Sequence, residues 1–343
     1  MTVILDGGLA TELEARGNDL SDRLWSARLL MTDPDAIADV HLAYYQAGAH
    51  VATTASYQAT IPGFLAEGLD AASAIDAIRR SVLLAQRARE TFMAESDASG
   101  VVVGNLLVAG SVGPYGAMLA DGSEYRGDYD PGAAVLREVH APRMEALLES
   151  GADLLAMETI PTIREAAVLV ALLDEFGATG WLSYQCRDGE STAAGEPIAD
   201  AIGVASGSAG MLAIGLNCTA PRFLPSLLAL AAPVTDLPLV AYPNGGDRWD
   251  ATARHWIADD AAGEFDGSRM ATWAEMGAGW IGGCCGTGPA DIAALAEALS
   301  EGTPTAQGTP TAMGTPTVDV TPTAQGTPTA MGTPTALFRT DPS

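Results

Sequence analysis

Residues 212–218 read LAIGLNC and residues 280–286 read WIGGCCG, and each stretch passes from an apolar run into cysteine. A short apolar run bounded by glycine and polar residues is typical of a buried β-strand and the turn that follows it. Eight such apolar runs occur in the first 300 residues, with helix-like segments between them. This alternation decides the expected fold.

The runs that we expect to form strands are Val3–Leu5, His50–Thr54, Val101–Leu106, Leu154–Glu158, Trp181–Gln185, Leu212–Leu216, Leu239–Tyr242 and Trp280–Gly282. Segments with helical periodicity include Ala71–Phe92, Ala133–Glu149, Ile163–Phe176 and Pro289–Leu299. Eight strands alternating with helices predict an α/β protein with one (β/α)8 TIM barrel. An open, doubly wound sheet fits the alternation nearly as well, but the glycine pattern of a dinucleotide site does not follow the first run.

Polar and glycine-rich clusters stand at or just after the ends of six of these runs, which favours the barrel. They are Asp6-Gly7-Gly8, Thr53-Thr54, Glu158-Thr159, Asn217-Cys218, Tyr242-Pro243-Asn244 and Gly283-Cys284-Cys285. In a (β/α)8 barrel the carboxyl ends of all strands meet at one face, where active sites are built. We therefore expect these clusters to surround a single site.

The charge of the chain excludes several functions. Its 343 residues include 43 acidic and 17 basic side chains, a formal net charge of -26, and every basic residue is arginine. Without lysine the chain cannot form the Schiff base of a pyridoxal-phosphate enzyme or the Walker phosphate loop. A field this negative repels nucleic-acid phosphates and anionic lipids, so we expect neither nucleic acid nor a membrane as a partner.

The two ends of the chain carry different signals. The N-terminus lacks the basic region and apolar stretch of a signal peptide, and no apolar run reaches 18 residues, so we expect a cytoplasmic protein. From Gly302 to Ala336 the chain repeats a hexad related to GTPTAQ, with a proline in every period and no aromatic residue. We therefore expect one globular domain over residues 1–300 and a disordered tail over residues 301–343.

Cys186, Cys218, Cys284 and Cys285 are too few for a disulfide scaffold in a chain of this length. Cys218 follows the sixth expected strand and Cys284-Cys285 follows the eighth, so three sulfurs can converge at the barrel mouth. Three cysteines would leave the fourth tetrahedral position of a zinc ion open, as in catalytic sites. A vicinal disulfide and unconnected thiols remain as alternatives. The charged turn after Cys186 argues against its being a fourth ligand.

Eight motifs resemble those of the homocysteine S-methyltransferase family, over about residues 1–300. They are DGGLATELEARG from Asp6, TTASYQAT from Thr53, GSVGPYG from Gly110, ADGSEYRGDY from Ala120, METIPT from Met157, GLNCTAP from Gly215, YPNGG from Tyr242 and GGCCGTGPADI from Gly282. Within that family the chain is most similar to enzymes that use S-methylmethionine or S-adenosylmethionine. The resemblance implies a (β/α)8 barrel that transfers a methyl group from such a sulfonium donor to L-homocysteine, producing methionine.

The resemblance also implies particular site residues. A zinc ion would be held by Cys218, Cys284 and Cys285. An adjoining homocysteine site would be lined by Asp6, Thr54, Glu158 and Asn217. In that site the carboxylate of Glu158 would bind the ammonium group of the substrate.

The implied chemistry agrees with the other residues of the chain. Coordination to zinc deprotonates a thiol, and a neutral thioether then leaves, so no general acid is needed. This agrees with the four histidines, which form no cluster along the sequence: His41, His50, His140 and His255. The donor is a cation, which an aromatic face can hold, and Tyr115 and Tyr125 are candidates for that contact.

Two functions from other classes fit the same residues. One is a thiol–disulfide redox barrel that uses Cys284 and Cys285, and the other is a non-catalytic binding protein that carries the repeat tail. Zinc content separates the first from a methyltransferase. Homocysteine-dependent methyl transfer separates the second.

Overall fold

The computed structural model describes residues 2–20, 26–100, 104–246, 248–250, 255–257 and 267–301. Its main sheet has eight parallel strands in the order β1, β10, β7, β6, β5, β4, β3, β2. Their bounds are β1 Val3–Ile4, β2 Val51–Thr53, β3 Leu107–Val112, β4 Leu154–Ile160, β5 Gly180–Tyr184, β6 Met211–Asn217, β7 Leu239–Tyr242 and β10 Ala278–Ile281. A separate antiparallel pair is formed by β8 (Arg248–Asp250) and β9 (His255–Ile257).

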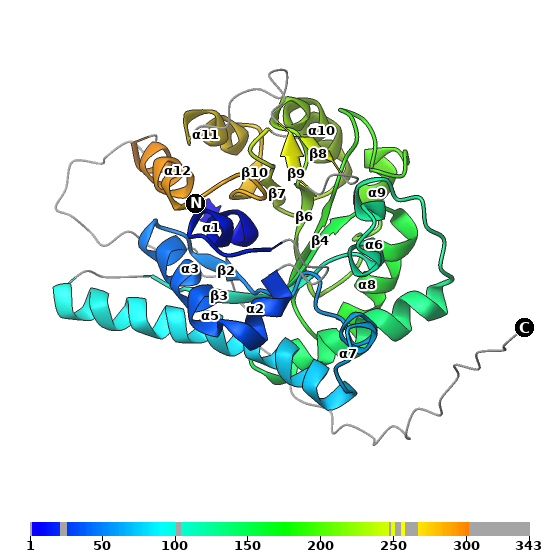
Figure 1. Ribbon diagram of the computed structural model, residues 1–343. Helices are drawn as coiled ribbons and strands as arrows, with labels where there is room; N and C mark the ends of the chain where they lie inside the picture. Colours follow the sequence, from blue (N-terminus) through cyan, green and yellow to red (C-terminus); the bar gives the residue numbers. More distant parts are fainter. Residues whose placement is uncertain are drawn as a thin grey trace, which may run out of the picture.

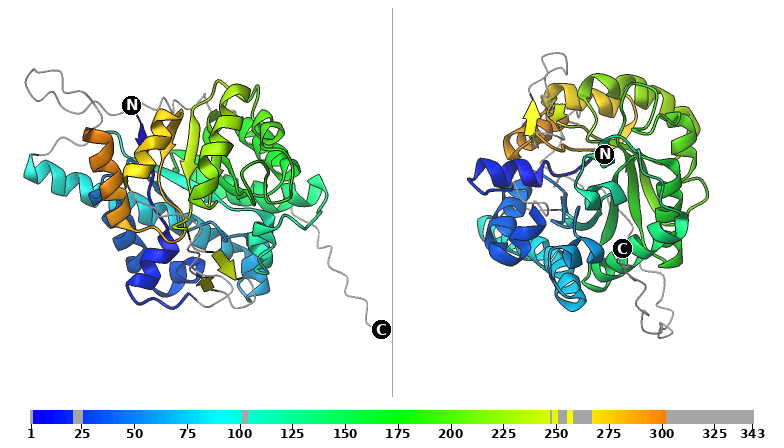
Figure 2. Two further views of the ribbon diagram at one scale, coloured as in Figure 1. Left: turned by 90° about the horizontal axis from the view of Figure 1, so that it is seen from above. Right: turned by 45° about the vertical axis from the view of Figure 1, so that its right-hand side comes forward.

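The ring is completed at β1, which pairs with β10 on one side and meets β2 on the other. A parallel bridge joins Leu5 to Val51, the backbone N–H of His50 donates to the Ile4 carbonyl at 2.7 Å, and that of Asp6 donates to the Val51 carbonyl at 3.1 Å. The strands form a ring with helices around its outside (Figures 1 and 2). The predicted (β/α)8 barrel is thus confirmed, and the open doubly wound sheet was wrong.

The helices follow the strands in the alternating order that the sequence predicts. Their bounds are α1 Leu9–Ala15, α2 Ser26–Thr32, α3 Pro34–Gln46, α4 Ile61–Ala66, α5 Ala71–Ser99, α6 Tyr115–Leu119, α7 Ala133–Glu149, α8 Ile163–Glu175, α9 Ile198–Gly203, α10 Leu224–Ala231, α11 Gly267–Glu275 and α12 Pro289–Glu301. Short 3-10 turns are η1 Ser123–Tyr125, η2 Pro221–Phe223 and η3 Ala232–Val234.

Local signals explain where the long helices begin and end. The side chain of Asp70 accepts a hydrogen bond from the Ser73 N–H at 2.7 Å and caps α5. The same helix ends at Gly100, whose φ of 71° places it in the left-handed conformation that favours glycine. Thr162 caps α8 in the same way, through the N–H of Glu165.

The third strand lies further along the chain than predicted. We expected it at Val101–Leu106, but it begins at Leu107 and runs to Val112. Residues 101–103 lie outside the described part, and residues 104–106 are not in a strand. Glycine and serine within LVAGSV resemble a turn in the sequence. In the structure Gly110 lies where a Cβ would come 3.1 Å from the Leu147 side chain, so a small residue is needed there for helix packing.

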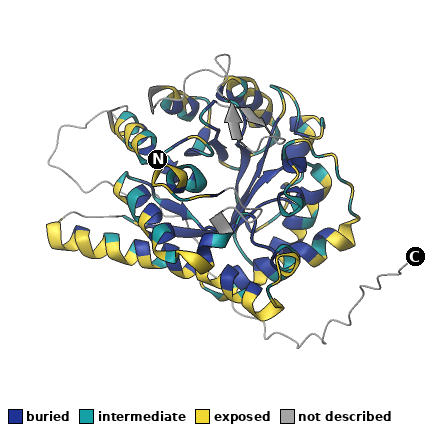
Figure 3. Cartoon of the chain, in the orientation of Figure 1, coloured by how far each residue is buried: buried dark blue, intermediate teal, exposed yellow. Residues whose placement is uncertain are grey.

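The core has two layers, one inside the barrel and one between the strands and the helices. Trp181 and Trp280 lie inside the barrel with ring centroids 5.6 Å apart, and Tyr242 packs edge-on against Trp181. Figure 3 shows buried strands at the centre and exposure mainly on the outward faces of the helices. Among the described residues, no helix is long and apolar enough to cross a membrane.

The predicted tail, residues 301–343, lies outside the described residues except for Glu301, the last residue of α12. We expect removal of residues 302–343 to change the free energy of unfolding by less than about 1 kcal/mol, because the hexads carry too little apolar surface to pack on the barrel. Denaturant unfolding of the full and shortened chains measures this difference. A larger loss of stability would show that the repeats pack against the domain.

Candidate metal centre and neighbouring carboxylates

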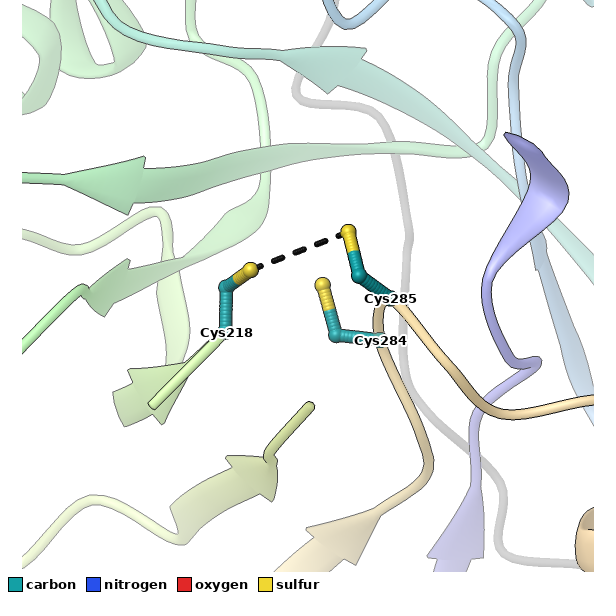
Figure 4. A group of neighbouring side chains, drawn as sticks. All are labelled: Cys218, Cys284 and Cys285. Atoms are coloured by element: carbon teal, nitrogen blue, oxygen red, sulfur yellow. Dashed lines mark hydrogen bonds between the residues drawn. The ribbon is translucent and has the colours of Figure 1, made fainter. Parts of the chain in front are cut away.

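Three cysteines converge at the carboxyl ends of β6 and β10 (Figure 4). The sulfur atoms of Cys218, Cys284 and Cys285 all lie within 4.8 Å of one another, and those of Cys218 and Cys285 are 3.8 Å apart. Cys218 is buried and the other two are half-buried. Cys186 is buried elsewhere and is not part of this group. None of the four forms a disulfide.

The backbone bends sharply at each cysteine. Cys218 has a φ of 46°, which is unusual for a residue with a Cβ, and its N–H donates to the Tyr242 carbonyl at 3.1 Å. The N–H of Cys284 donates to the Pro243 carbonyl at 2.8 Å. Gly286, directly after the pair, has a φ of 81°. These bends let both cysteines of the pair turn toward Cys218, which a straight strand would not allow.

Barrel closure brings the N-terminal segment against the cysteine pair. The N–H of Gly283 donates to the Asp6 carbonyl at 3.0 Å, and that of Gly8 donates to the Thr287 carbonyl at 3.0 Å. A Cβ on Gly8 would lie only 2.6 Å from the Cys284 carbonyl oxygen. Glycine at position 8 is therefore required by close approach of two backbones.

The donor atoms suit a thiophilic metal ion. Hydrogen bonds among the three thiols lower the pKa of Cys285 well below its usual value and raise that of Cys218. The amide nitrogen of Asn217 lies 3.8 Å from the Cys284 sulfur. One acidic thiol among three converging sulfurs gives a set that a soft or borderline divalent ion can hold.

Two buried carboxyl groups adjoin the cysteines. Burial raises the pKa of Asp6 to about 8, although hydrogen bonds from the Thr53 N–H and hydroxyl, at 2.6 and 2.8 Å, oppose this. The pKa of Glu158 is raised to about 7, mainly by burial and secondly by the charge of the nearby Cys284 sulfur. The charge of Glu158 also raises the pKa of Asp6, so the two groups sense each other. Among the described residues, no ion pair joins either carboxylate to an arginine.

Glu158 is held by two hydroxyl groups, neither of which we assigned to it from the sequence. The hydroxyl of Ser111 donates to it at 2.5 Å, and that of Tyr242 donates to it at 3.1 Å. The indole N–H of Trp181 donates in turn to the Tyr242 oxygen at 2.9 Å. Ser111 and Tyr242 stand in the GSVGPYG and YPNGG motifs, so the sequence signal was present but did not reveal their partner.

Thr54 and Asn217, which the family resemblance assigns to the homocysteine site, are hydrogen-bonded to other protein groups. The Thr54 hydroxyl accepts from the Ser111 N–H at 2.9 Å and contacts the Ser56 hydroxyl at 2.7 Å. The amide oxygen of Asn217 accepts from the Thr159 N–H at 2.7 Å, and its nitrogen donates to the Thr159 hydroxyl at 2.7 Å. Both side chains position neighbours of Glu158 and Cys284.

The two expected aromatic residues have different surroundings. The pKa of Tyr125 is raised well above its usual value. Burial is the largest cause, and the charges of the Cys218 and Cys285 sulfurs come next. Tyr115 instead packs its ring against Tyr129, with centroids 5.5 Å apart. Burial also raises the pKa of Tyr57, a residue that we did not single out, and the charges of Cys218 and Glu158 add to this shift.

Known proteins resemble this chain over nearly all of the described part. A family model described as homocysteine S-methyltransferase matches residues 3–299. The homocysteine S-methyltransferase of Escherichia coli is 48% identical over 294 residues, which are 85% of this chain and 94% of that protein. The homocysteine S-methyltransferase YbgG of Bacillus subtilis is 44% identical over 86% of this chain and 93% of its own.

A solved structure is similar as well. The crystal structure of the homocysteine methyltransferase MmuM from Escherichia coli, in its metallated form, superposes with a TM-score of 0.77. It is 46% identical, and the match covers 86% of this chain and 96% of that one.

The close contact at Gly8 predicts a loss of metal binding on substitution. Gly8→Ala should weaken Zn²⁺ binding at least about tenfold, because the new methyl group would displace the Cys284 backbone. Gly8 has a φ of -71°, so alanine meets no backbone restriction there and the effect is one of contact. Gly132→Ala is the matched control, since its Cβ would meet open space. Equal Zn²⁺ affinity in the two variants, measured by competition with a chelator, would contradict this account.

The raised pKa of Asp6 predicts a pH-dependent stability. Between the usual value of 3.8 and about 8 the folded protein holds a proton that the unfolded chain has released, so rising pH destabilises the fold. Asp6→Asn removes this contribution. Between about pH 5 and about pH 8, the metal-free wild type should lose at least about 1 kcal/mol of unfolding free energy relative to the variant. Parallel pH profiles in denaturant unfolding would show that Asp6 is ionised throughout.

Proposed function

The chain belongs to the homocysteine S-methyltransferase family, and we propose that it transfers a methyl group from a sulfonium donor to the thiol of L-homocysteine with a zinc ion as cofactor. The observation that carries the proposal is the convergence of three cysteine sulfurs within 4.8 Å at the barrel mouth, beside two buried carboxyl groups. A thiol–disulfide redox function leaves the two carboxyl groups without a role. Family membership also favours the transferase.

Cys218, Cys284 and Cys285 would hold the zinc ion. Three protein ligands leave one tetrahedral position for a substrate atom, as catalytic zinc sites require. When bound, zinc would lower the pKa of a thiol that joins it, so that homocysteine would release its thiol proton to solvent at neutral pH. The hydrogen bond from Asn217 to the Cys284 sulfur and the bend at Cys218 keep the protein sulfurs in place.

Asp6 and Glu158 would bind the ammonium group of homocysteine. Both are buried, burial raises the pKa of each, and among the described residues no arginine forms an ion pair with either one. An ammonium group between them would favour the ionised form of each. Thr54, through Ser111, and Asn217, through Thr159, would fix the neighbours of Glu158 and so contribute indirectly.

The transfer itself needs no acid or base from the protein at the moment of reaction. The deprotonated sulfur of homocysteine attacks the donor methyl carbon, and a new S–C bond forms. The old bond breaks with its electron pair moving to the donor sulfur, which leaves as a neutral thioether. Tyr125, beside the sulfurs of Cys218 and Cys285, would face the cationic sulfur of the donor, S-methylmethionine or S-adenosylmethionine. Methionine is the product.

Two variants separate metal binding from substrate binding. Cys285→Ala should lose zinc and abolish transfer, because only two cysteine sulfurs would remain to hold the ion. Glu158→Ala should keep zinc and raise the apparent KM for homocysteine at least about tenfold, because a buried carboxylate paired with an ammonium group contributes strongly to binding. Metal analysis and methionine formation from each donor measure these outcomes.

A thiol acceptor without the amino group serves as the control for the Glu158 variant. It has no ammonium group to lose, so wild type and Glu158→Ala should methylate it almost equally. If Glu158→Ala weakened the methylation of both thiols equally, Glu158 would not be the residue that binds the ammonium group. A wild type that binds no zinc, or forms no methionine with either donor, would overturn the proposed function.

A further inference from the structure

Glu124 is a buried carboxylate with one oxygen that no group in the described part of the chain satisfies. It lies in η1, within the ADGSEYRGDY motif, and only 2% of its surface is exposed. Its Oε2 atom is fully buried and finds no hydrogen-bond partner among the residues that the structure describes. An unpaired buried carboxylate is costly, and such groups are retained where a ligand completes them.

Arg126 and Tyr129 are engaged with other groups, whereas the hydroxyl of the adjacent Ser123 is, like Oε2 of Glu124, buried without a hydrogen-bond partner among the described residues. The guanidinium of Arg126 donates to the Asp128 carboxylate at 2.8 Å and to the Asp121 carbonyl at 3.2 Å. The hydroxyl of Tyr129 donates to Glu165 at 2.6 Å. Within the part of the chain that the structure describes, no cation pairs with Glu124.

Two tyrosines connect Glu124 with the metal centre. Besides burial, the charges of Cys218 and Cys285 and that of Glu124 all raise the pKa of Tyr125, so Tyr125 lies near both groups. Tyr57 likewise senses Glu124 and Cys218. The backbone of Glu124 is pressed against α6, since a Cβ on Gly116 would lie 2.6 Å from the Glu124 nitrogen. Glu124 stands in the segment that follows β3, so it lies at the carboxyl-end face of the barrel, the face that also carries the three cysteines.

The proposed reaction brings two amino acids together, and each carries an α-ammonium group. Asp6 and Glu158 serve the acceptor. In S-methylmethionine three carbon atoms separate the cationic sulfur from the α-nitrogen, so the second ammonium group lies beyond the sulfonium as seen from the metal centre. We propose that Glu124 binds the α-ammonium group of the methyl donor while Tyr57 and Tyr125 border its sulfonium. This inference rests on the proposed function of the three cysteines.

The electrostatics of Glu124 agree with this role. Burial raises its pKa to about 7, and the nearby charge of Asp121 acts in the same direction, while a backbone hydrogen bond and the charge of Arg126 oppose the shift. A bound ammonium group would favour the ionised form and lower that pKa. A neutral ligand, or an anionic one, would gain nothing from this group.

The test uses Glu124→Gln in the full chain, with zinc bound. The KM for S-methylmethionine should rise at least about tenfold, because the amide keeps the shape but loses the charge. The inhibition constant of 4-(dimethylsulfonio)butanoate, which is S-methylmethionine without its amino group, should change less than about twofold. Asp121→Asn is the matched control, since it removes one acidic charge from the same loop at an exposed position.

The outcomes separate this inference from the proposed function. Zinc content, thermal unfolding and the KM for homocysteine should be unchanged in Glu124→Gln, which shows that the variant folds and keeps the acceptor site. An unchanged KM for S-methylmethionine would overturn the inference while leaving the proposed function intact. An equal weakening of S-methylmethionine and the deaminated analogue would also overturn it, because Glu124 would then act on the sulfonium or on the loop. Failure of the wild type to methylate homocysteine would instead overturn the proposed function.

Discussion

Pairing between the first strand and the last is the constraint on which the site depends. The N–H of Leu5 donates to the Ile281 carbonyl at 2.8 Å, and that of Gly283 donates to the Asp6 carbonyl at 3.0 Å. These bonds close the barrel and, in the same step, lay the turn of the cysteine pair against the segment after β1. Without closure, Cys284 and Asp6 would belong to opposite ends of a sheet. The metal centre and the first carboxylate are therefore products of the topology.

Much of this arrangement could be predicted from the sequence, because strand ends in a barrel share one face. Cys218 and Cys284-Cys285 follow apolar runs directly, so their convergence required only the fold. The third strand was misplaced because Gly110 and Ser111 have turn-like chemistry, whereas the structure uses one for close helix packing and the other for a hydrogen bond to Glu158. Strand patterns cannot reveal such uses, since they depend on what lies across the barrel.

Side-chain burial within loops was beyond the sequence as well. Glu124 stands in a segment rich in charged residues, where solvent exposure is the usual expectation. It is buried because the segment folds back over α6, where Gly116 permits close approach. Thr54 contacts Ser111 and Asn217 contacts Cys284, but the hydroxyl and amide groups of both are hydrogen-bonded to protein atoms. A sequence motif predicts that a residue lies near the active site. Only the structure shows whether its side chain is free to contact the substrate or instead holds neighbouring residues in place.

The segments that carry Tyr57 and Tyr115 are fixed from beneath by a buried polar cluster. Arg143 donates to the Gly113 carbonyl and to the His140 ring, and Glu165 accepts from His140 at 2.7 Å and from the Tyr115 N–H at 2.6 Å. Burying these groups adds little net stability, because desolvation offsets most of their attraction. Their directional bonds do, however, allow only one arrangement of the loop that ends β3. Methyl transfer requires two sulfur atoms and one carbon atom to be aligned. It therefore depends more on a loop with one defined conformation than on additional stability.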